Sequence, residues 1–142
     1  MARGDGLGRV FNVIPVADGV EVNLRDAGAV TFVCTLVDGD TFTVQESVGA
    51  AGTPRNLAVV ERYSTATAAD GSVAWVDVEQ AAAATVVIGT GVDVAVFTIR
   101  ADQLSDGYTH VDVTSTSTGT VVAIAHDLHT QRKPSNLTPL GA

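Results

Sequence analysis

The sequence predicts an all-β fold, an antiparallel β-sandwich of the Ig-like or jelly-roll-like kind with extended N- and C-terminal arms. Short runs rich in Val, Thr, Ile and Phe recur along the 142 residues, and such side chains favour strands. Between the runs stand five Asp-Gly pairs, which favour tight turns because both residues tolerate positive φ. These pairs begin at Asp5, Asp18, Asp38, Asp70 and Asp106. Short strands separated by such turns are typical of sandwiches and barrels.

Alternation of apolar and polar residues places the strands. It is cleanest in 20–24, 29–37 and 41–48. The runs 29–37 and 41–48 flank Asp38-Gly39-Asp40, so we expect them to pair as an antiparallel hairpin. A single helical turn is expected at 101–104. Further strands are expected at 9–14, 73–79, 85–89, 92–100, 108–115 and 120–128.

The later strands are apolar on both faces. Val94 and Val96 face one way while Phe97 and Ile99 face the other, and the run 120–128 repeats the pattern. In a small antiparallel sandwich one face of each sheet normally meets water. The second apolar face therefore predicts a cover, which is either a loop or another subunit.

The chain is expected to form one domain, residues 9–129, between a flexible N-terminal arm, 1–8, and an extended C-terminal arm, 130–142. Two prolines favour extended backbone in the C-terminal arm, which also carries two leucines and an Arg-Lys pair. Such an arm can lie along its own domain or along a neighbour, and the alternative is a frayed terminus. If it docks on a neighbour, deleting 131–142 leaves the fold intact. The predicted partner-binding residues are Arg132, Lys133, Pro134, Asn136, Leu137 and Leu140.

The acidic balance excludes several classes of partner. With 8 Lys+Arg against 16 Asp+Glu the net charge is −8, which disfavours nucleic acids and anionic membranes. The sequence contains no apolar run of the roughly 18 residues that would span a bilayer, and its start has no signal-peptide pattern. Charged residues make up only 17%, so small polar residues must cover much of the surface. Removing water from such a surface when a partner binds costs little free energy.

Motifs for catalysis are missing from the sequence. It has no nucleotide-binding glycine pattern, no paired-cysteine motif and no nucleophile elbow, so we predict no catalytic, cofactor-binding or metal-binding residue and no enzymatic activity. The single cysteine, Cys34, excludes an internal disulfide and is expected to be a small buried hydrophobe. Trp75 is expected to anchor the core.

The three histidines offer one alternative. His126 and His129 flank Asp127, and together with His110 they could hold zinc. On a strand, however, positions 126 and 129 point to opposite faces. We therefore expect ordinary surface histidines.

Three segments carry a resemblance to a known group: Phe42 to Ser47, Leu104 to Val111, and Asp127 to Leu137. In these segments the chain resembles small structural proteins of tailed bacteriophages that infect actinobacteria. The resemblance implies a capsid decoration or head-stabilising protein. Its partners would be the major capsid protein and further copies of itself, with a trimer favoured and a dimer as the alternative. It would be assembled in the bacterial cytoplasm and located on the capsid surface of the virion.

Three other functions remain open at this point. A tail-tube or minor tail protein would share the β content and would polymerise on its own. A carbohydrate-binding β-sandwich module would be a monomer with affinity for a glycan. A small hydrolase would need carboxylates or a nucleophile brought together in space.

Overall fold

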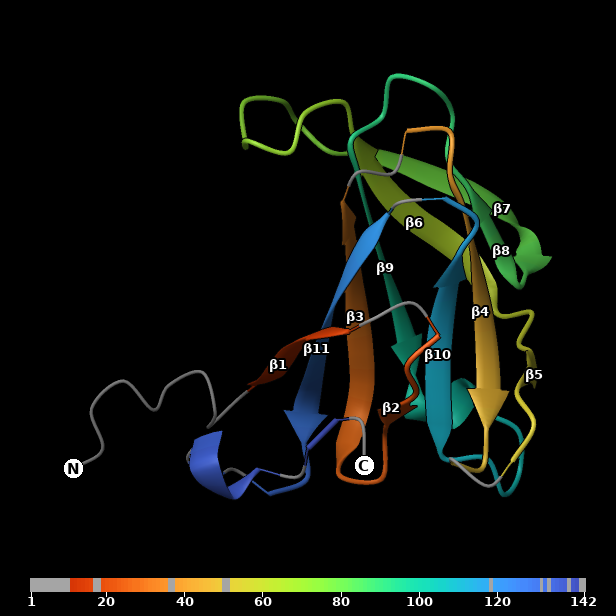
Figure 1. Ribbon diagram of the computed structural model, residues 1–142, viewed down its shortest axis with the longest axis vertical. Helices are drawn as coiled ribbons and strands as arrows, with labels where there is room; N and C mark the ends of the chain where they lie inside the picture. Colours follow the sequence, from red (N-terminus) through yellow and green to blue (C-terminus); the bar gives the residue numbers. More distant parts are fainter. Residues whose placement is uncertain are drawn as a thin grey trace.

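A computed structural model describes residues 11–16, 19–35, 38–49, 52–117, 119–130, 132, 134–137 and 139–140. Two antiparallel sheets pack against each other, which confirms the predicted β-sandwich (Figure 1). The six-stranded sheet has the order β1-β11-β3-β9-β6-β7, and the five-stranded sheet has the order β2-β10-β4-β5 with β8 also paired to β4. The strands are β1 (Phe11–Val16), β2 (Val22–Asn23), β3 (Ala27–Thr35), β4 (Thr41–Ser47), β5 (Arg55–Asn56), β6 (Val60–Ala66), β7 (Val76–Ala83), β8 (Thr85–Val87), β9 (Val94–Arg100), β10 (His110–Ser115) and β11 (Thr120–Leu128).

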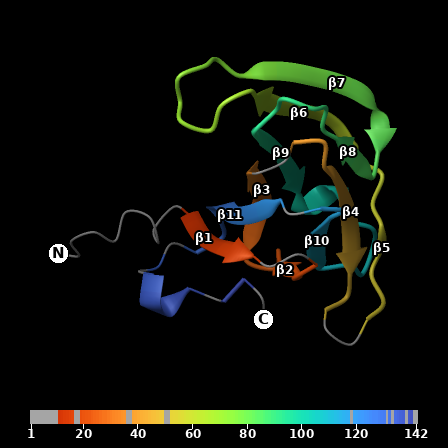
Figure 2. The same ribbon diagram turned by 45° about the horizontal axis from the view of Figure 1, so that its top comes forward.

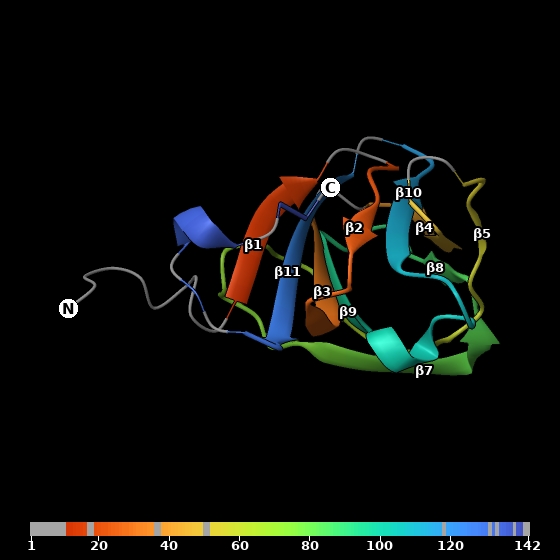
Figure 3. The ribbon, with the colours of Figure 1, turned by 90° about the horizontal axis from the view of Figure 1, so that it is seen from below.

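The core lies between the inward faces of the two sheets (Figure 3). Alternate residues of β3, β9 and β11 point into it, and the Phe32 and Phe97 rings meet there with their centroids 5.6 Å apart. The five-stranded sheet contributes Phe42, Val44 and other apolar side chains from the opposite side. Burial of this apolar area is the main stabilisation of the fold.

The expected hairpin between 29–37 and 41–48 is wrong. β3 pairs with β9 and β11 in one sheet, whereas β4 pairs with β10, β5 and β8 in the other. The buried carboxylate of Asp40 is the physical reason, because it accepts hydrogen bonds from the end of β10 and from the connection to β11, which fixes the start of β4 beside β10. The turn at Asp38 and Gly39 thus carries the chain across the sandwich rather than back along the same sheet.

One side of the sandwich is closed by a continuous stretch of chain. β7 belongs to the six-stranded sheet and β8 to the five-stranded sheet, and the chain changes sheets at Ala84 (Figure 2). The Val44 N–H donates to the Ala84 carbonyl at 2.7 Å. The Gln80 amide donates to the Val60 and Thr85 carbonyls at 2.9 and 3.0 Å. Strands that switch sheets in this way form the corners of sandwiches.

Other elements differ from expectation in detail. β5 and β6 were not predicted, and β7 runs from 76 to 83 instead of 73–79. The expected helical turn is present as a 3₁₀ turn, η1 (Ala101–Gln103). A second 3₁₀ turn, η2 (Pro134–Asn136), lies in the tail that was expected to be extended. The predicted N-terminal arm, 1–8, lies outside the described residues. In the part of the chain that is described, helices long and apolar enough to cross a membrane are absent.

Candidate binding surface

The outward side of the six-stranded sheet forms a broad surface, which we call the outer face. It is defined by the residues of β1, β11, β3 and β9 that alternate with the buried core positions. One cross-strand row is apolar through four adjacent strands, and its members lie directly opposite one another: Pro15, Val122, Val33 and Val96. The next row contains Val13, Ile124, Thr31 and Thr98. The predicted second apolar face is therefore present.

The polar side chains of the outer face bond to one another. The Thr31 hydroxyl lies 2.8 Å from the Thr98 hydroxyl and 2.9 Å from His126 Nε2. His126 Nδ1 in turn lies 3.0 Å from a carboxylate oxygen of Asp127. A separate hydroxyl pair joins Thr35 to Thr120. The outer face thus combines apolar rows with hydroxyl groups that already have partners.

The order Asp127, His126, Thr31 is that of an acid, a base and a hydroxyl in hydrolases. A hydrolase also needs donors for the developing oxyanion. Thr31 lies in the middle of β3, which is paired with β11 on one side and β9 on the other, so the neighbouring N–H groups are used in the sheet. We therefore interpret this chain of hydrogen bonds as part of the surface. Sequence spacing could not reveal it, because Thr31 and His126 are 95 positions apart.

A second exposed apolar surface precedes and opens β7. It consists of Val73, Trp75 and Val76, and we call it the Trp75 segment. Trp75 is 53% exposed and Val76 is 59% exposed, so the prediction that Trp75 anchors the core is wrong. The reason is its position before the first residue of an edge strand, in a connection that projects away from the five-stranded sheet (Figures 1 and 2).

The predicted partner-binding residues of the tail do not share one environment. Arg132 and Asn136 are exposed, and Leu137 is half-buried. Lys133 lies outside the described residues, and Pro134 opens η2. Leu140 is only 3% exposed and belongs to the hydrophobic core of its own domain.

The burial of Leu140 corrects the expectation that it docks on a neighbour. The Asn23 N–H donates to the Leu140 carbonyl at 2.7 Å, which fastens the tail to the edge strand β2. Leu140 therefore covers the side of the sandwich between β1 and β2, opposite the corner at Ala84. Deleting 131–142 removes a core residue, so we expect this deletion to destabilise the fold.

A small pocket remains beneath the tail. Its volume is about 40 Å³, far below the roughly 300–1,000 Å³ typical of small-molecule sites. It has room for one or a few water molecules. Its lining residues are Asn12, Asn23, Asp26, Ala27, Ala125, Leu128, Thr130, Arg132, Leu137 and Leu140.

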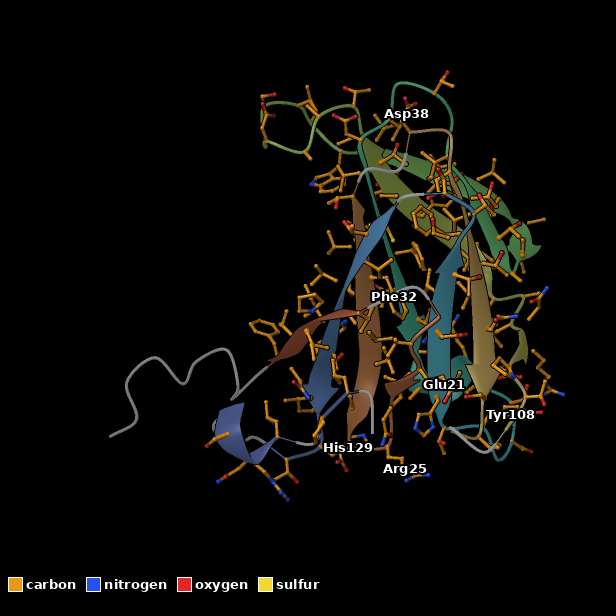
Figure 4. The ribbon with its side chains drawn as sticks, viewed as in Figure 1. Glu21, Arg25, Phe32, Asp38, Tyr108 and His129 are labelled. Atoms are coloured by element: carbon orange, nitrogen blue, oxygen red, sulfur yellow. The ribbon has the colours of Figure 1, made fainter. Side chains whose placement is uncertain are left out.

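Asp40, Glu46 and Asp112 are the buried carboxylates of the described residues, and the first two lie toward opposite ends of the sandwich, where Figure 4 labels Asp38 and Tyr108. At one end, Asp40 accepts hydrogen bonds from Ser115 and Gly119 on one oxygen and from Thr41 and Thr116 on the other. Desolvation alone would raise the pKa of Asp40, but these hydrogen bonds outweigh it and hold the pKa below its ordinary value.

At the other end, Glu46 accepts hydrogen bonds from the Ser105 N–H at 2.8 Å, the Ser105 hydroxyl at 2.7 Å and Arg55 Nε at 2.9 Å. Desolvation again opposes ionisation, and the Ser105 and Arg55 contacts overcome it, so the pKa of Glu46 also lies below its ordinary value. The Arg55 guanidinium lies 4.2 Å from the centroid of the Tyr108 ring. Both carboxylates therefore serve to fasten loops to strands.

The remaining nucleophilic and metal-ligating residues are dispersed. Cys34 is fully buried as predicted, and burial, with a smaller contribution from the Asp40 charge, raises the pKa of its thiol to about 12. His110 is buried on β10, so the expectation of a surface histidine is wrong at this position. His126 lies on the outer face, and His129 is exposed where the tail begins (Figure 4). Among the described residues, His, Cys, Asp and Glu side chains form no group of three that could hold a metal ion.

Comparisons of the chain with protein-family models, with curated proteins and with solved structures found no match.

Proposed function

We propose that this chain is a virion structural protein, a capsid decoration protein that binds the outer surface of the major capsid protein lattice and stabilises the head. It works by contact between protein surfaces, as a homo-oligomer located on the capsid, without a catalytic step or a cofactor. The resemblance of three segments to structural proteins of tailed actinobacteriophages supports this proposal.

The Trp75 segment is the observation that carries the proposal. Monomeric proteins rarely expose contiguous large apolar side chains without a function, and Trp is among the residues most enriched at the energetic centres of interfaces. Val73, Trp75 and Val76 are all exposed within four consecutive positions, and the low charge of the chain lowers the desolvation cost around them. We assign lattice contact to this segment, with the exposed Arg132 of the tail as a second contact.

Mixing the purified protein with undecorated phage heads tests the proposal. Light scattering gives the mass of the protein alone, and co-sedimentation gives the fraction bound to heads. We expect saturable binding by the native protein. The double substitution Trp75→Ser and Val76→Ser should weaken binding by roughly 30-fold, the effect of losing about 2 kcal/mol at an interface centre.

Val87→Ser is the matched control, because Val87 is 62% exposed but lies on β8 in the other sheet. It should bind heads like the native protein. Native protein that ignores heads and instead polymerises into tubes would establish the tail-protein alternative. A monomer that ignores heads would overturn the proposal and direct the search to glycans.

A further inference from the structure

The outer face of the six-stranded sheet is partly exposed, carries little charge, and has hydroxyl groups that are already hydrogen-bonded. From this combination we infer that the outer face is a self-association surface, on which a second copy of the same chain packs sheet against sheet in a two-fold dimer. The inference specifies the surface of the homo-oligomer in the proposed function. The predicted dimer itself does not depend on capsid binding.

The apolar row is the first argument. Pro15, Val122, Val33 and Val96 are directly opposed on neighbouring strands, so they form one continuous line across four strands. Phe11 on β1 is also exposed and lies opposite His126. Two such lines, crossing at the roughly 30° usual for aligned sheets, interdigitate in the way that sandwich cores do.

The hydrogen bonds of the hydroxyl groups are the second argument. A polar group that is buried without a partner costs about 1–3 kcal/mol. On the outer face, Thr31 bonds both Thr98 and His126, and Thr35 bonds Thr120. An approaching surface therefore removes water from this face without leaving these hydroxyls unpaired and needs to supply no polar group of its own. A largely apolar surface such as the outer face itself meets this requirement.

The low charge of the outer face favours a second copy of the chain as its binding partner. The chain carries 16 acidic against 8 basic residues, so two copies repel through most of their surfaces. Among the described outward-facing residues of β1, β11, β3 and β9, the charged side chain is Arg100, which is paired with Asp102 at 2.9 Å. Asp127 stands at the border of the face, bonded to His126. Two copies can therefore meet here with little repulsion between carboxylates.

The available area fits a modest dimer. The four strands of the outer face lie about 4.8 Å apart and together are about 105 Å long, so they offer roughly 500 Å² in each copy, and a pair would bury roughly 1,000 Å². That value is at the lower end of specific interfaces. A flat face packed on its own equivalent closes as a dimer, because the same patch serves both subunits. The inference thus selects the dimer over the trimer that the resemblance favours.

Sedimentation equilibrium over a range of protein concentrations tests the inference on the full chain. We expect the native protein to pass from monomer to dimer as concentration rises. Val33→Glu places a carboxylate in the middle of the apolar row of both copies and should raise the dissociation constant at least tenfold. Val87→Glu, on the outward side of the other sheet, should dimerise like the native protein. Circular dichroism and the melting temperature verify that both variants are folded.

A labelling experiment needs no disruptive substitution. Pro15→Cys introduces an accessible thiol into the outer face, while the native Cys34 is buried. Its reaction with a maleimide should slow as the protein concentration rises, whereas Val87→Cys should react at a constant rate. Native protein that stays monomeric throughout, a trimer, or labelling of Pro15→Cys that is independent of concentration would overturn the inference.

Head binding separates this inference from the proposed function. A dimer that depends on Val33 but ignores heads refutes decoration and leaves the inference standing. If the native protein binds heads as a monomer and Val33→Glu abolishes that binding, the outer face contacts the capsid and the inference is wrong.

Discussion

The Arg55 guanidinium joins the Glu46 carboxylate across the edge of the five-stranded sheet, with Nε and Oε1 2.9 Å apart. The two side chains differ sharply in environment, since Glu46 is buried and Arg55 is more than half exposed. Because Glu46 also accepts two hydrogen bonds from Ser105, it links β4, β5 and the connection before β10. The buried carboxylate is the member of the pair that stability depends on.

Replacing Glu46 by Gln should therefore destabilise the protein. The amide keeps the shape, but its NH₂ group faces donors, and a buried network that loses its charged acceptor costs about 2–3 kcal/mol. Urea unfolding measures the change. Glu79→Gln is the matched control, because Glu79 is paired with Arg62 on an exposed surface where an ion pair contributes at most about 1 kcal/mol. Equal losses in the two variants would contradict the assignment.

Acid should destabilise the fold through Asp40 and Glu46 together. Both have a folded-state pKa below the ordinary carboxyl value, so their contribution is fully present above that value, near pH 4. The contribution is lost as the pH falls through the lowered values. We expect the free energy of unfolding to decrease from about pH 4 downward.

The substitution Asp40→Asn isolates one of these two carboxylates. The variant should be about 2–3 kcal/mol less stable at neutral pH, because the hydrogen bonds from Ser115 and Thr116 lose their charged acceptor. Its stability should then fall less steeply than that of the native protein in acid. Unfolding curves at several pH values test this, and parallel pH profiles for the two proteins would rule out Asp40 as a source of the acid sensitivity.

Leu140 should matter to stability although only two residues follow it in the sequence. Leu140→Ala removes a side chain from the core and should cost about 2–3 kcal/mol, within the usual range for buried leucines. Leu137→Ala, which truncates a half-buried leucine of the same tail, should cost clearly less. Thermal unfolding compares the two, and a frayed tail would instead make both substitutions neutral.

Cys34 should be inert in the folded protein. Its thiol is buried and its pKa is raised to about 12, so almost no thiolate forms at neutral pH. A thiol reagent should react with Cys34 at the rate of unfolding and react at once in denaturant. Rapid modification of the native protein would show that β3 opens readily.

Much of the fold could be predicted from residue patterns. Runs such as 120–128 alternate between core and outward positions, and the period of two residues suffices to identify a strand and its two faces. The same pattern cannot say which sheet a strand joins. The pairing of β3 and β4 failed for this reason, because Asp40 looks like a turn residue until its distant partners Ser115 and Thr116 are known.

The candidate surfaces were less predictable. The second apolar face of 92–100 and 120–128 was foreseen, but the hydrogen bonds of Thr31, Thr98 and His126 depend on pairings across three strands. β6 escaped notice because Glu61, Arg62 and Ser64 interrupt its apolar pattern. Trp75 was assigned to the core by residue type, whereas its exposure follows from the position of β7 at the sheet edge.

Because the chain changes sheets at Ala84, the two sides of the sandwich differ in how strongly they connect the two sheets. On that side the sheets share an unbroken backbone, supported by the Val44 hydrogen bond to Ala84. On the opposite side they are held by the tail, through Leu140 and its carbonyl bond to Asn23. Under a pulling force the two sheets should therefore separate first on the side held by Leu140, and the backbone at Ala84 should act as the hinge.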